Sequence, residues 1–444
     1  MAFNGINGIA RRYERPLPSQ VRFLLITIGS HGDVHPFLAL GRALKQRGHE
    51  VALATNPYFE QQIAREGLHP VALTEFGDLK ELMSGAGAKA MNPHSGPIVV
   101  LRDLMLPMVP QIVENTRRAI AEFKPDAAVI HHFCLGARWP CEQKGVPTAV
   151  CALSPCTWFN TRDKIVMPSF RGENPGPLTV KFDVWAGRVF IGAIIDRTLN
   201  RIRREMGMSA GKHWMHREPS LGDIALGLWS PHFRAPLPGD PAGSTVCGFP
   251  WHDRDEEREG VPDWEHFLND GEPPLVFCLG TAAVHTAGKF YHDAAEACRT
   301  LNRRGMLLVG RTELLNHSWP KDVRAFAYAP FSRLFPRAAV NIHHGGIGST
   351  GQALRAGKPT LICPLSHDQY DNAARCARLG VSRTLKHAKV SPGRMADSLR
   401  SLLEEPSCFS RAAAFGAKIA AEDGAALAAA KAEELGRIGR AGRA

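Results

Sequence analysis

Short apolar runs alternate along the chain with longer segments of helical periodicity. Residues 21–28 form a nearly continuous apolar run that ends at Gly29, as is typical of a strand buried on both faces of a parallel sheet. Residues 36–47 place apolar side chains at helical spacing, Gly48 ends that pattern, and residues 50–55 supply a second strand. This unit has the size of a right-handed parallel crossover. Further strands are predicted at 126–130, 148–153 and 224–228.

The alternating pattern breaks between residues 231 and 260 and then starts again. The break holds five prolines and a charge run from Asp253 to Glu259, which is typical of a linker or a domain edge. Beyond it we predict strands at 274–280, 306–310, 339–343 and 360–363, and helical segments at 290–304 and 411–438. The repetition predicts an α/β fold, with two Rossmann-like, doubly wound domains facing each other across a cleft.

The expected domain organisation follows from this break. It comprises a flexible leader (1–20), an N-terminal Rossmann-like domain (21–247), a linker (248–260), a C-terminal Rossmann-like domain (261–425) and a terminal helix or tail (426–444).

Composition fits an ordinary globular protein, with 44% hydrophobic and 22% charged residues. No apolar run reaches the roughly 20 residues of a membrane span, and we interpret the nearest candidate, residues 189–195, as one face of a helix. The first twenty residues lack the apolar core of a secretory signal. Ten cysteines are scattered without a CxxC pair. We therefore expect a cytoplasmic protein with free thiols and no zinc site.

A formal net charge of +11 indicates an anionic partner. No helix-turn-helix, zinc-finger or RNA-binding aromatic motif accompanies the charge, so we expect no nucleic acid partner. An anionic small molecule or an anionic membrane surface explains the charge at least as well, and peripheral contact with the inner membrane face is one expectation.

The loop after the first strand, residues 29–36, is the first candidate for chemistry. Parallel sheets bind ligands beyond the carboxyl ends of their strands, and Gly29 and Gly32 permit a sharp turn and close approach of a ligand. Asp33 lies where the chain turns into the next helix, so its carboxylate could face the cleft. The competing interpretation is a helix cap, which is the commoner role of Asp at a helix start.

A glycine-rich stretch, residues 339–351, is the most informative part of the sequence. A strand runs into paired histidines and glycines and then into a helix that we expect to begin near Ser349. The exposed N–H groups and positive dipole end of such a helix suit a diphosphate. The stretch lacks the Gly-Lys-Ser/Thr ending of nucleotide-triphosphate loops.

Asp368 and Gln369 follow the strand at 360–363 and again lie at a carboxyl end. A carboxylate beside an amide offers both acceptors and donors to sugar hydroxyls. Singly, each is more often a solvated loop residue.

Residues 343–349 with Pro364, Asp368 and Gln369 resemble the donor-binding signature of family 1 glycosyltransferases, which have the GT-B fold. The loop at 29–36 resembles the matching loop of bacterial and sterol-type members. The likeness covers nearly the whole chain after residue 20 and is greatest to the rhamnosyltransferase B chain of rhamnolipid synthesis and to sterol glucosyltransferases.

On the acceptor side, the resemblance implies that Asp33 is the general base that takes the proton of the acceptor hydroxyl. His31 and His35 flank it but do not match the position of the family base, so they rank below it. Plant-type members place an aspartate after the strand at 126–130 to orient their base, and this chain has His131 and His132 there.

On the donor side, the resemblance implies that His343 meets the diphosphate and that a small hydroxyl residue assists it. The implied donor-binding residues are Gly32, Thr281, Tyr328, Ala329, His343, Gly345, Gly346, Gly348, Ser349, Asp368 and Gln369. The loop around Tyr328 would receive the base of the nucleotide. No metal site and no cofactor are implied, and the donor would be a UDP- or dTDP-sugar.

The resemblance therefore implies an inverting, metal-independent transfer of a hexose, rhamnose or glucose, to a hydroxyl of an apolar, lipid-like acceptor. The acceptor would lie on the N-terminal domain, where apolar side chains are frequent: Met83, Met91, Leu104, Met105, Leu106, Met108, Trp158, Phe159, Met167, Phe170, Trp185 and Phe190. Three alternatives stay open: a nucleotide-sugar epimerase of GT-B fold, a MurG-like transferase, and a catalytically silent nucleotide-sugar-binding partner protein.

Overall fold

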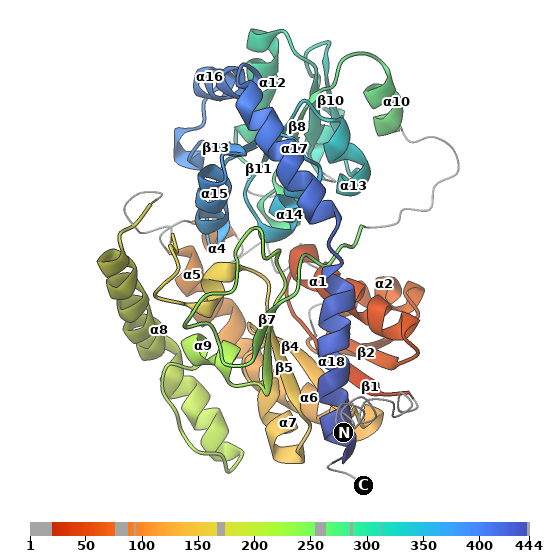
Figure 1. The fold of residues 1–444 in the computed structure, drawn as a ribbon, viewed down its shortest axis with the longest axis vertical. Coiled ribbons are helices and arrows are strands. Elements are labelled where there is room, and N and C mark those ends of the chain that lie inside the picture. Colours follow the sequence, from red (N-terminus) through yellow and green to blue (C-terminus); the bar gives the residue numbers. More distant parts are fainter. Residues whose placement is uncertain are drawn as a thin grey trace, which may run out of the picture.

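A computed structural model describes residues 20–75, 88–92, 95–166, 174–253, 263–284, 287–310 and 312–441. Some predictions fall outside these ranges. They concern the leader up to residue 19, the part of the predicted linker after residue 253, and the side chains Met83, Met167 and Phe170. Two α/β units are stacked one above the other in Figure 1, with the N-terminal unit below.

The N-terminal sheet has seven parallel strands in the order β3-β2-β1-β4-β5-β6-β7. The strands are β1 (Arg22–Ile26), β2 (Glu50–Thr55), β3 (His69–Ala72), β4 (Ala127–His131), β5 (Thr148–Ala152), β6 (Ile224–Gly227) and β7 (Ser244–Val246). In the central register Leu24 pairs with Ala52 of β2 and with Ala128 of β4. Alternate β1 side chains enter two separate hydrophobic clusters, because helices cover both faces of the sheet.

The C-terminal sheet has six parallel strands in the order β10-β9-β8-β11-β12-β13. They are β8 (Leu275–Cys278), β9 (Gly305–Leu308), β10 (Val323–Phe326), β11 (Val340–His343), β12 (Thr360–Ile362) and β13 (Ser382–Thr384). Both sheets confirm the predicted pair of Rossmann-like domains.

The helices of the N-terminal unit are mostly those that connect its strands. They are α1 (His31–Gln46), η2 (Pro57–Phe59), α2 (Glu60–Arg65), α4 (Ala88–Ala90), α5 (Gly96–Val99), η4 (Val100–Met105, of π type), α6 (Leu106–Phe123), α7 (Arg138–Lys144), η5 (Pro155–Trp158), α8 (Pro177–Glu205), α9 (Trp214–Arg217) and η6 (Glu218–Ser220).

The remaining helices follow the crossing to the second unit. They are α10 (Asp263–Asn269), α11 (Gly280–Ala283), α12 (Phe290–Leu301), η8 (Glu313–Asn316), α13 (Phe331–Leu334), η9 (Phe335–Arg337), α14 (Ile347–Arg355), α15 (Gln369–Arg378), η10 (His387–Lys389), α16 (Pro392–Leu403), α17 (Pro406–Ala420) and α18 (Gly424–Ala441).

Helix α1 begins five residues earlier than its apolar periodicity predicts. The expected helix starts at Pro36, but the structure starts it at His31, with Ser30 as N-cap. Pro36 then lies inside the helix as its sixth residue, where it leaves the Gly32 carbonyl without its usual intrahelical partner. Asp33 consequently lies in the first turn of α1 rather than in a free loop.

The predicted helical segment 411–438 is two helices that belong to different units. Helix α17 stays with the C-terminal unit, whereas Ala428, Ala429, Ala432 and Leu435 of α18 join a hydrophobic cluster of the N-terminal unit. In Figure 1 the chain passes from α17 down to α18, which lies along the lower unit.

The two passages between the units touch at a pair of glycines. A Cβ added at Gly424 would lie 2.3 Å from the carbonyl carbon of Gly248, and Gly248 has φ +106°. No side chain fits at Gly424, so the close approach of these two segments requires glycine. Ser230 also donates a hydrogen bond to Glu422 beside this contact, at 2.7 Å.

The helix that continues from Gly96 to Phe123 has the length and mean hydropathy of a membrane span, although polar residues interrupt its apolar residues. Half of its most apolar window is buried within the structure. Its side chains Val109, Ile112 and Val113 pack into the N-terminal core. The helix is therefore accounted for as a core element of the N-terminal unit.

Candidate active site

The loops at the carboxyl ends of the two sheets meet each other between the units. The Ser366 hydroxyl, after β12, donates to the main-chain oxygen of Asn92 at 3.2 Å, and the Ser154 hydroxyl, after β5, donates to Asn372 of α15 at 3.3 Å. Both sheets thus turn their ligand-binding edges toward one junction.

Asp33 closes a capping box at the start of α1. Its Oδ2 atom accepts hydrogen bonds from the Ser30 backbone N–H at 2.8 Å and the Ser30 hydroxyl at 3.2 Å, while Gly32 N–H donates to Ser30 Oγ at 3.3 Å. Asp33 therefore does take part in capping α1, which was the interpretation that competed with a catalytic role. It engages only one carboxylate oxygen, because Oδ1 has no hydrogen-bond partner within the described residues. One side chain can serve both roles.

Asp33 and Asp368 are close enough for their charges to interact. Loss of hydration raises the pKa of Asp33 to about 6, the Ser30 hydrogen bonds oppose the rise, and the negative charge of Asp368 adds to it. Burial likewise raises the pKa of Asp368 to about 6. The two carboxylates come from different units, so the junction brings together the predicted base and the predicted sugar ligand.

The three histidines predicted near the base occupy different places. The His31 ring contacts the His35 ring edge-on at 5.1 Å, and the His35 ring lies 4.7 Å from His252 of the crossing segment. His132 is buried and its Nδ1–H donates to the Cys151 carbonyl at 3.2 Å. Burial lowers the pKa of His132 to about 4, so it is neutral near pH 7.

His131 does not orient the Asp33 carboxylate. Its Nδ1 lies 3.3 Å from Thr27 Oγ1, and that hydroxyl donates to the backbone carbonyl of Asp33 at 3.0 Å. The chain of hydrogen bonds from His131 therefore ends on the main chain. Desolvation, rather than a charge relay, is what makes the Asp33 carboxylate more basic.

The N-terminus of α14 is the predicted diphosphate site. Gly346 is its N-cap, no side chain caps the first turn, and the helix starts at Ile347, two residues before the expected start. A Cβ placed on the exposed Gly348 would meet nothing within 4 Å. Free N–H groups facing open space at a positive dipole end are what a diphosphate requires. Ser349 lies in the same turn and is buried.

Gly345 joins β11 to this helix and must be glycine. It has φ +93°, and a Cβ there would lie 2.9 Å from Ile362 Cγ2 and 3.0 Å from the Gln369 carbonyl oxygen. Both the dihedral angle and the neighbouring atoms exclude other residues.

His343 and His344 differ in what they can offer a ligand. His343 is fully buried, and its Nδ1 accepts the Gly345 N–H at 3.0 Å. Burial lowers the pKa of His343 to about 3, so the neutral ring carries its proton on Nε2, a buried donor with no acceptor among the described residues. An unmet donor of this kind costs about 1–3 kcal/mol.

His344 is the residue that sequence reasoning passed over. Its half-buried ring fills the space between Gly280 and Gly346, where added Cβ atoms would lie 2.6 Å and 2.5 Å from it. The twin histidine in the sequence was the available signal. His344 is therefore a second candidate for contact with the diphosphate.

The Asp368–Gln369 pair starts helix α15, but the two side chains are not equally free. Gln369 Oε1 accepts the backbone N–H groups of Leu365 and Ser366 at 2.8 and 3.1 Å, which fixes the loop after β12. Only its amide N–H₂ group is left for a ligand. Asp368 Oδ2 accepts from Asn372 Nδ2 at 2.8 Å.

The other predicted donor contacts lie on neighbouring loops of the same sheet edge. Thr281 is in α11 directly after β8, and its side chain is outside what the structure describes. Tyr328 and Ala329 follow β10, where Tyr328 is half-exposed and Ala329 is fully buried. These placements stay compatible with a nucleotide lying across the sheet edge.

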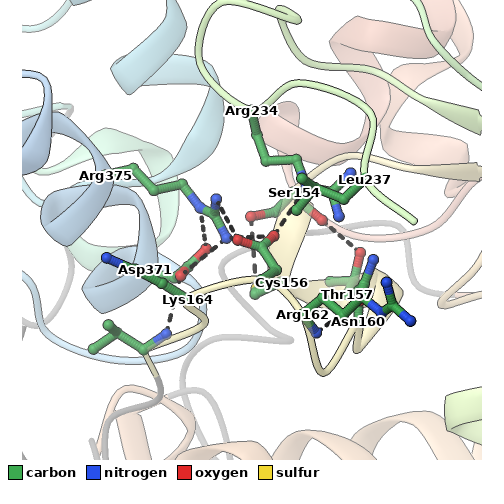
Figure 2. A network of polar contacts seen from close by, with 12 residues as sticks. Ser154, Cys156, Thr157, Asn160, Arg162, Lys164, Arg234, Leu237, Asp371 and Arg375 are labelled. Carbon is green, nitrogen blue, oxygen red and sulfur yellow. Dashed lines mark hydrogen bonds and ion pairs between the residues drawn. The ribbon is translucent and has the colours of Figure 1, made fainter. Parts of the chain in front are cut away.

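A buried charge network ties the two units together beside the site (Figure 2). Arg375 of α15 reaches Asp163 of the N-terminal unit with Nη1 and Nη2, at 3.1 and 3.0 Å, and Asp371 with Nε at 2.7 Å. Arg234 donates to Asp163 from the other side at 2.9 Å. The Val166 N–H donates to Asp371 at 3.0 Å. Helix α15 is thereby held against the N-terminal unit by paired, fork-like contacts.

The apolar residues predicted for the acceptor do not form one surface. Met105, Leu106, Met108 and Trp158 are buried in cores of the N-terminal unit. Met91 packs instead against the core of the C-terminal unit, and Leu104 and Phe159 are half-buried. Trp185 and Phe190 are exposed on α8. The sequence shows that these residues are apolar but not which way they face.

Among the described residues no group of three or more His, Cys, Asp or Glu side chains is arranged to hold a metal ion. All ten cysteines are free and buried.

Comparison with protein families matches both units. Residues 23–129 match the glycosyltransferase family 28 N-terminal domain, and residues 308–435 match the erythromycin biosynthesis protein CIII-like C-terminal domain. The chain is 31% identical over 419 residues to O-mycaminosyltylonolide 6-deoxyallosyltransferase of Streptomyces fradiae, covering 91% of this chain and 95% of that protein. It is 27% identical over 377 residues to sterol 3-beta-glucosyltransferase UGT80A2 of Arabidopsis thaliana, covering 83% of this chain and 58% of that protein.

Solved structures show the same fold. The glycosyltransferase of kitacinnamycin aligns with a TM-score of 0.70 at 21% identity, covering 94% of this chain and all of that one. Glycosyltransferase VinC, solved in complex with dTDP, aligns with a TM-score of 0.65 at 19% identity, covering 94% and 99%. The chain belongs to the nucleotide-sugar glycosyltransferases of GT-B fold, the family of macrolide glycosyltransferases and sterol glucosyltransferases.

Proposed function

We propose that this glycosyltransferase moves a hexose, rhamnose or glucose, from a UDP- or dTDP-sugar to a hydroxyl of an apolar, lipid-like acceptor, with inversion at the anomeric carbon and without a metal ion. The observation that carries the proposal is that Ser30 binds only Oδ2 of Asp33 at the start of α1, while the N-terminus of α14 in the other unit has no side-chain cap. The names of the sterol and macrolide relatives support an apolar acceptor.

In the proposed reaction Asp33 Oδ1 takes the proton of the acceptor hydroxyl as its oxygen attacks the anomeric carbon. Ser30 keeps the carboxylate oriented through Oδ2. A raised pKa makes the ionised carboxylate a stronger base while leaving most of it ionised near pH 7. A single displacement of this kind inverts the configuration of the sugar.

The nucleoside diphosphate leaves with its charge facing the N-terminus of α14. The uncapped N–H groups there, with His343 or His344, would stabilise the growing negative charge. Asp368 and the amide of Gln369 would hold the sugar. Metal independence rests on these dipoles and donors, which supply what a divalent ion would otherwise supply.

The test is the Asp33→Asn variant with a panel of nucleotide sugars. Asparagine keeps the helix cap, because its side-chain oxygen accepts the Ser30 N–H, but it cannot take a proton. We expect kcat to fall by about 10²–10⁴-fold, with the donor-induced rise in melting temperature unchanged. The wild-type kcat/KM should rise with pH through about 6 as the carboxylate ionises. Near-normal turnover of the variant would remove Asp33 from the role of base.

Controls separate the role of Asp33 from the rest of the proposal. Asp368→Asn should weaken donor binding, which Asp33→Asn leaves intact. Activity that survives exhaustive chelation supports metal independence, and activity lost on chelation and restored by a divalent ion refutes it.

A further inference from the structure

The outer face of helix α8 is an exposed apolar stripe. The described part of the chain has seven exposed large hydrophobic side chains, and five of them lie on the first half of α8. Leu178 is 80% exposed, Phe182 62% and Trp185 53%, and Val189 and Phe190 are also exposed. The helix runs along the outer edge of the N-terminal unit (Figure 1).

The spacing of these residues forms a continuous stripe. Leu178, Phe182, Trp185 and Val189 follow one another at intervals of four, three and four residues, which places them on one side of a helix with about 3.6 residues per turn. The Phe182 and Trp185 rings are in contact, with centroids 5.9 Å apart. A contiguous apolar surface of this kind marks an interaction site rather than chance exposure.

Positive charges lie along both edges of this face of α8. At about 100° per residue, Lys181 and Arg188 lie along one edge, beside the stripe. Arg197, Arg201 and Arg204 lie along the other edge on the second half of α8, seven to fourteen residues beyond Phe190, and Arg201 is 3.9 Å from Glu205.

The negative charges of α8 do not balance them. Glu205 is the exposed acidic residue of the helix, whereas Asp183 and Asp196 are half-buried. Asp196 is moreover occupied by the backbone N–H groups of His213 and Trp214, at 2.6 and 3.2 Å. The exposed face of α8 is therefore apolar on the first half of the helix, with basic residues along one edge there and along the other edge of its second half.

A shallow groove of about 510 Å³ continues the stripe between α8 and the 210–213 segment. Gly192, Ala193 and Lys212 are among the residues that line it.

We propose that this face of α8, the stripe together with its basic edges, docks the enzyme onto an anionic lipid surface. Aromatic and aliphatic side chains would enter the boundary between headgroups and acyl chains, and the flanking Lys and Arg would meet anionic headgroups, as in interfacial amphipathic helices. A second copy of the chain is a poorer occupant, because a two-fold contact would bring the same basic edges together. Trp185 and Phe190 are also among the residues predicted for the acceptor, so the test measures vesicle binding without a nucleotide sugar and is independent of the proposed reaction.

The test is sedimentation of the full chain with sucrose-loaded vesicles of phosphatidylcholine, with and without phosphatidylglycerol. We expect binding to the anionic vesicles, weakening as salt is added, and little binding to neutral ones. Phe182→Ser with Trp185→Ser should lower the affinity for anionic vesicles by tenfold or more, while Phe182→Leu with Trp185→Phe should largely preserve it. The exposed Leu427, on α18, provides the apolar control as Leu427→Ser.

The basic edge is tested separately. Arg197→Gln, Arg201→Gln and Arg204→Gln together should lower the affinity by about fivefold for each arginine removed. A triple variant with the same charge change elsewhere, at the exposed Lys321, Arg394 and Lys418, should have a clearly smaller effect. Unchanged urea midpoints confirm that the variants are folded.

Three results would overturn the proposal. Absence of binding to anionic vesicles refutes it, as does equal binding to neutral and anionic vesicles. A dimer in light scattering that the Phe182 and Trp185 substitutions dissociate would assign the surface to a second copy instead.

Discussion

Replacing Asp33 by asparagine should stabilise the protein, and the gain should depend on pH in a defined way. The folded state raises the pKa of this carboxyl from 3.8 to about 6, chiefly by desolvation and partly by repulsion from Asp368. Between those two values the folded protein binds the proton more tightly than the unfolded chain. Stability is therefore lost as pH rises through this window, and the full cost applies above the folded pKa.

The magnitude follows from the size of the shift. A rise of the pKa from 3.8 to about 6, at 1.36 kcal/mol for each pKa unit, corresponds to about 3 kcal/mol at neutral pH. Asparagine pays a smaller desolvation cost of its own and keeps the hydrogen bond to the Ser30 N–H. A net gain of about 1–3 kcal/mol near pH 7, shrinking toward zero near pH 4, is the expected outcome.

Urea unfolding of the two proteins between pH 4 and 8 measures this difference, because every other group titrates almost equally in both. Asp33→Ala serves as the comparison, since it removes the charge but also the cap and gives up about 1 kcal/mol. A stability difference that is constant with pH, or a less stable Asn variant at pH 7, would refute the claim that burial in the cleft makes Asp33 basic.

Three further outcomes follow from contacts described above. Arg375→Met leaves the buried carboxylates of Asp163 and Asp371 without their shared partner and should lower the free energy of unfolding in urea by about 3–5 kcal/mol. The control is loss of an exposed arginine that pairs with an aspartate, such as Arg400, which should cost under about 1 kcal/mol. A small loss at Arg375 would show that the network contributes little to stability. Gly345→Ala should destabilise by more than about 1 kcal/mol because of its positive φ, while Gly348→Ala should fold normally and weaken donor binding in titration calorimetry; unchanged donor affinity would move the diphosphate away from α14. The ten buried thiols should react with a disulfide reagent only after unfolding, because burial raises the pKa of thiols such as Cys151 and Cys363; rapid labelling of the folded protein would contradict this.

Whether a strand was predicted from the sequence depends on its position in the sheet. The nine predicted strands are the interior ones, which are covered on both faces and consist mostly of apolar residues. The four strands it missed, β3, β7, β10 and β13, are the edges of the two sheets. Edge strands have a solvent-facing side, so they are short and mixed, and β3 even contains Pro70, which an edge tolerates.

The candidate site was predictable to the level of its loops but not of its side-chain geometry. Glycines at 345 and 346 and the acid–amide pair at 368–369 identified the donor edge because backbone approach and sugar binding require those residue types. No sequence pattern shows which histidine of the pair is accessible, because this depends on packing. The same holds for Gln369, whose side-chain oxygen accepts hydrogen bonds from the backbone of residues 365–366. The destination of the last helix depends likewise on tertiary contacts.

Helix α18 packs against the N-terminal unit, and this determines which segments of the chain can be exchanged between related enzymes. An acceptor half cut out at the linker would lack Leu435 and the alanines that seal one face of its sheet, and would expose that face to solvent. A chimaera that recombines donor and acceptor preferences must therefore take its N-terminal half and its final helix from the same parent. The second splice point belongs between Ala421 and Asp423, just ahead of the glycine contact where the two connections meet.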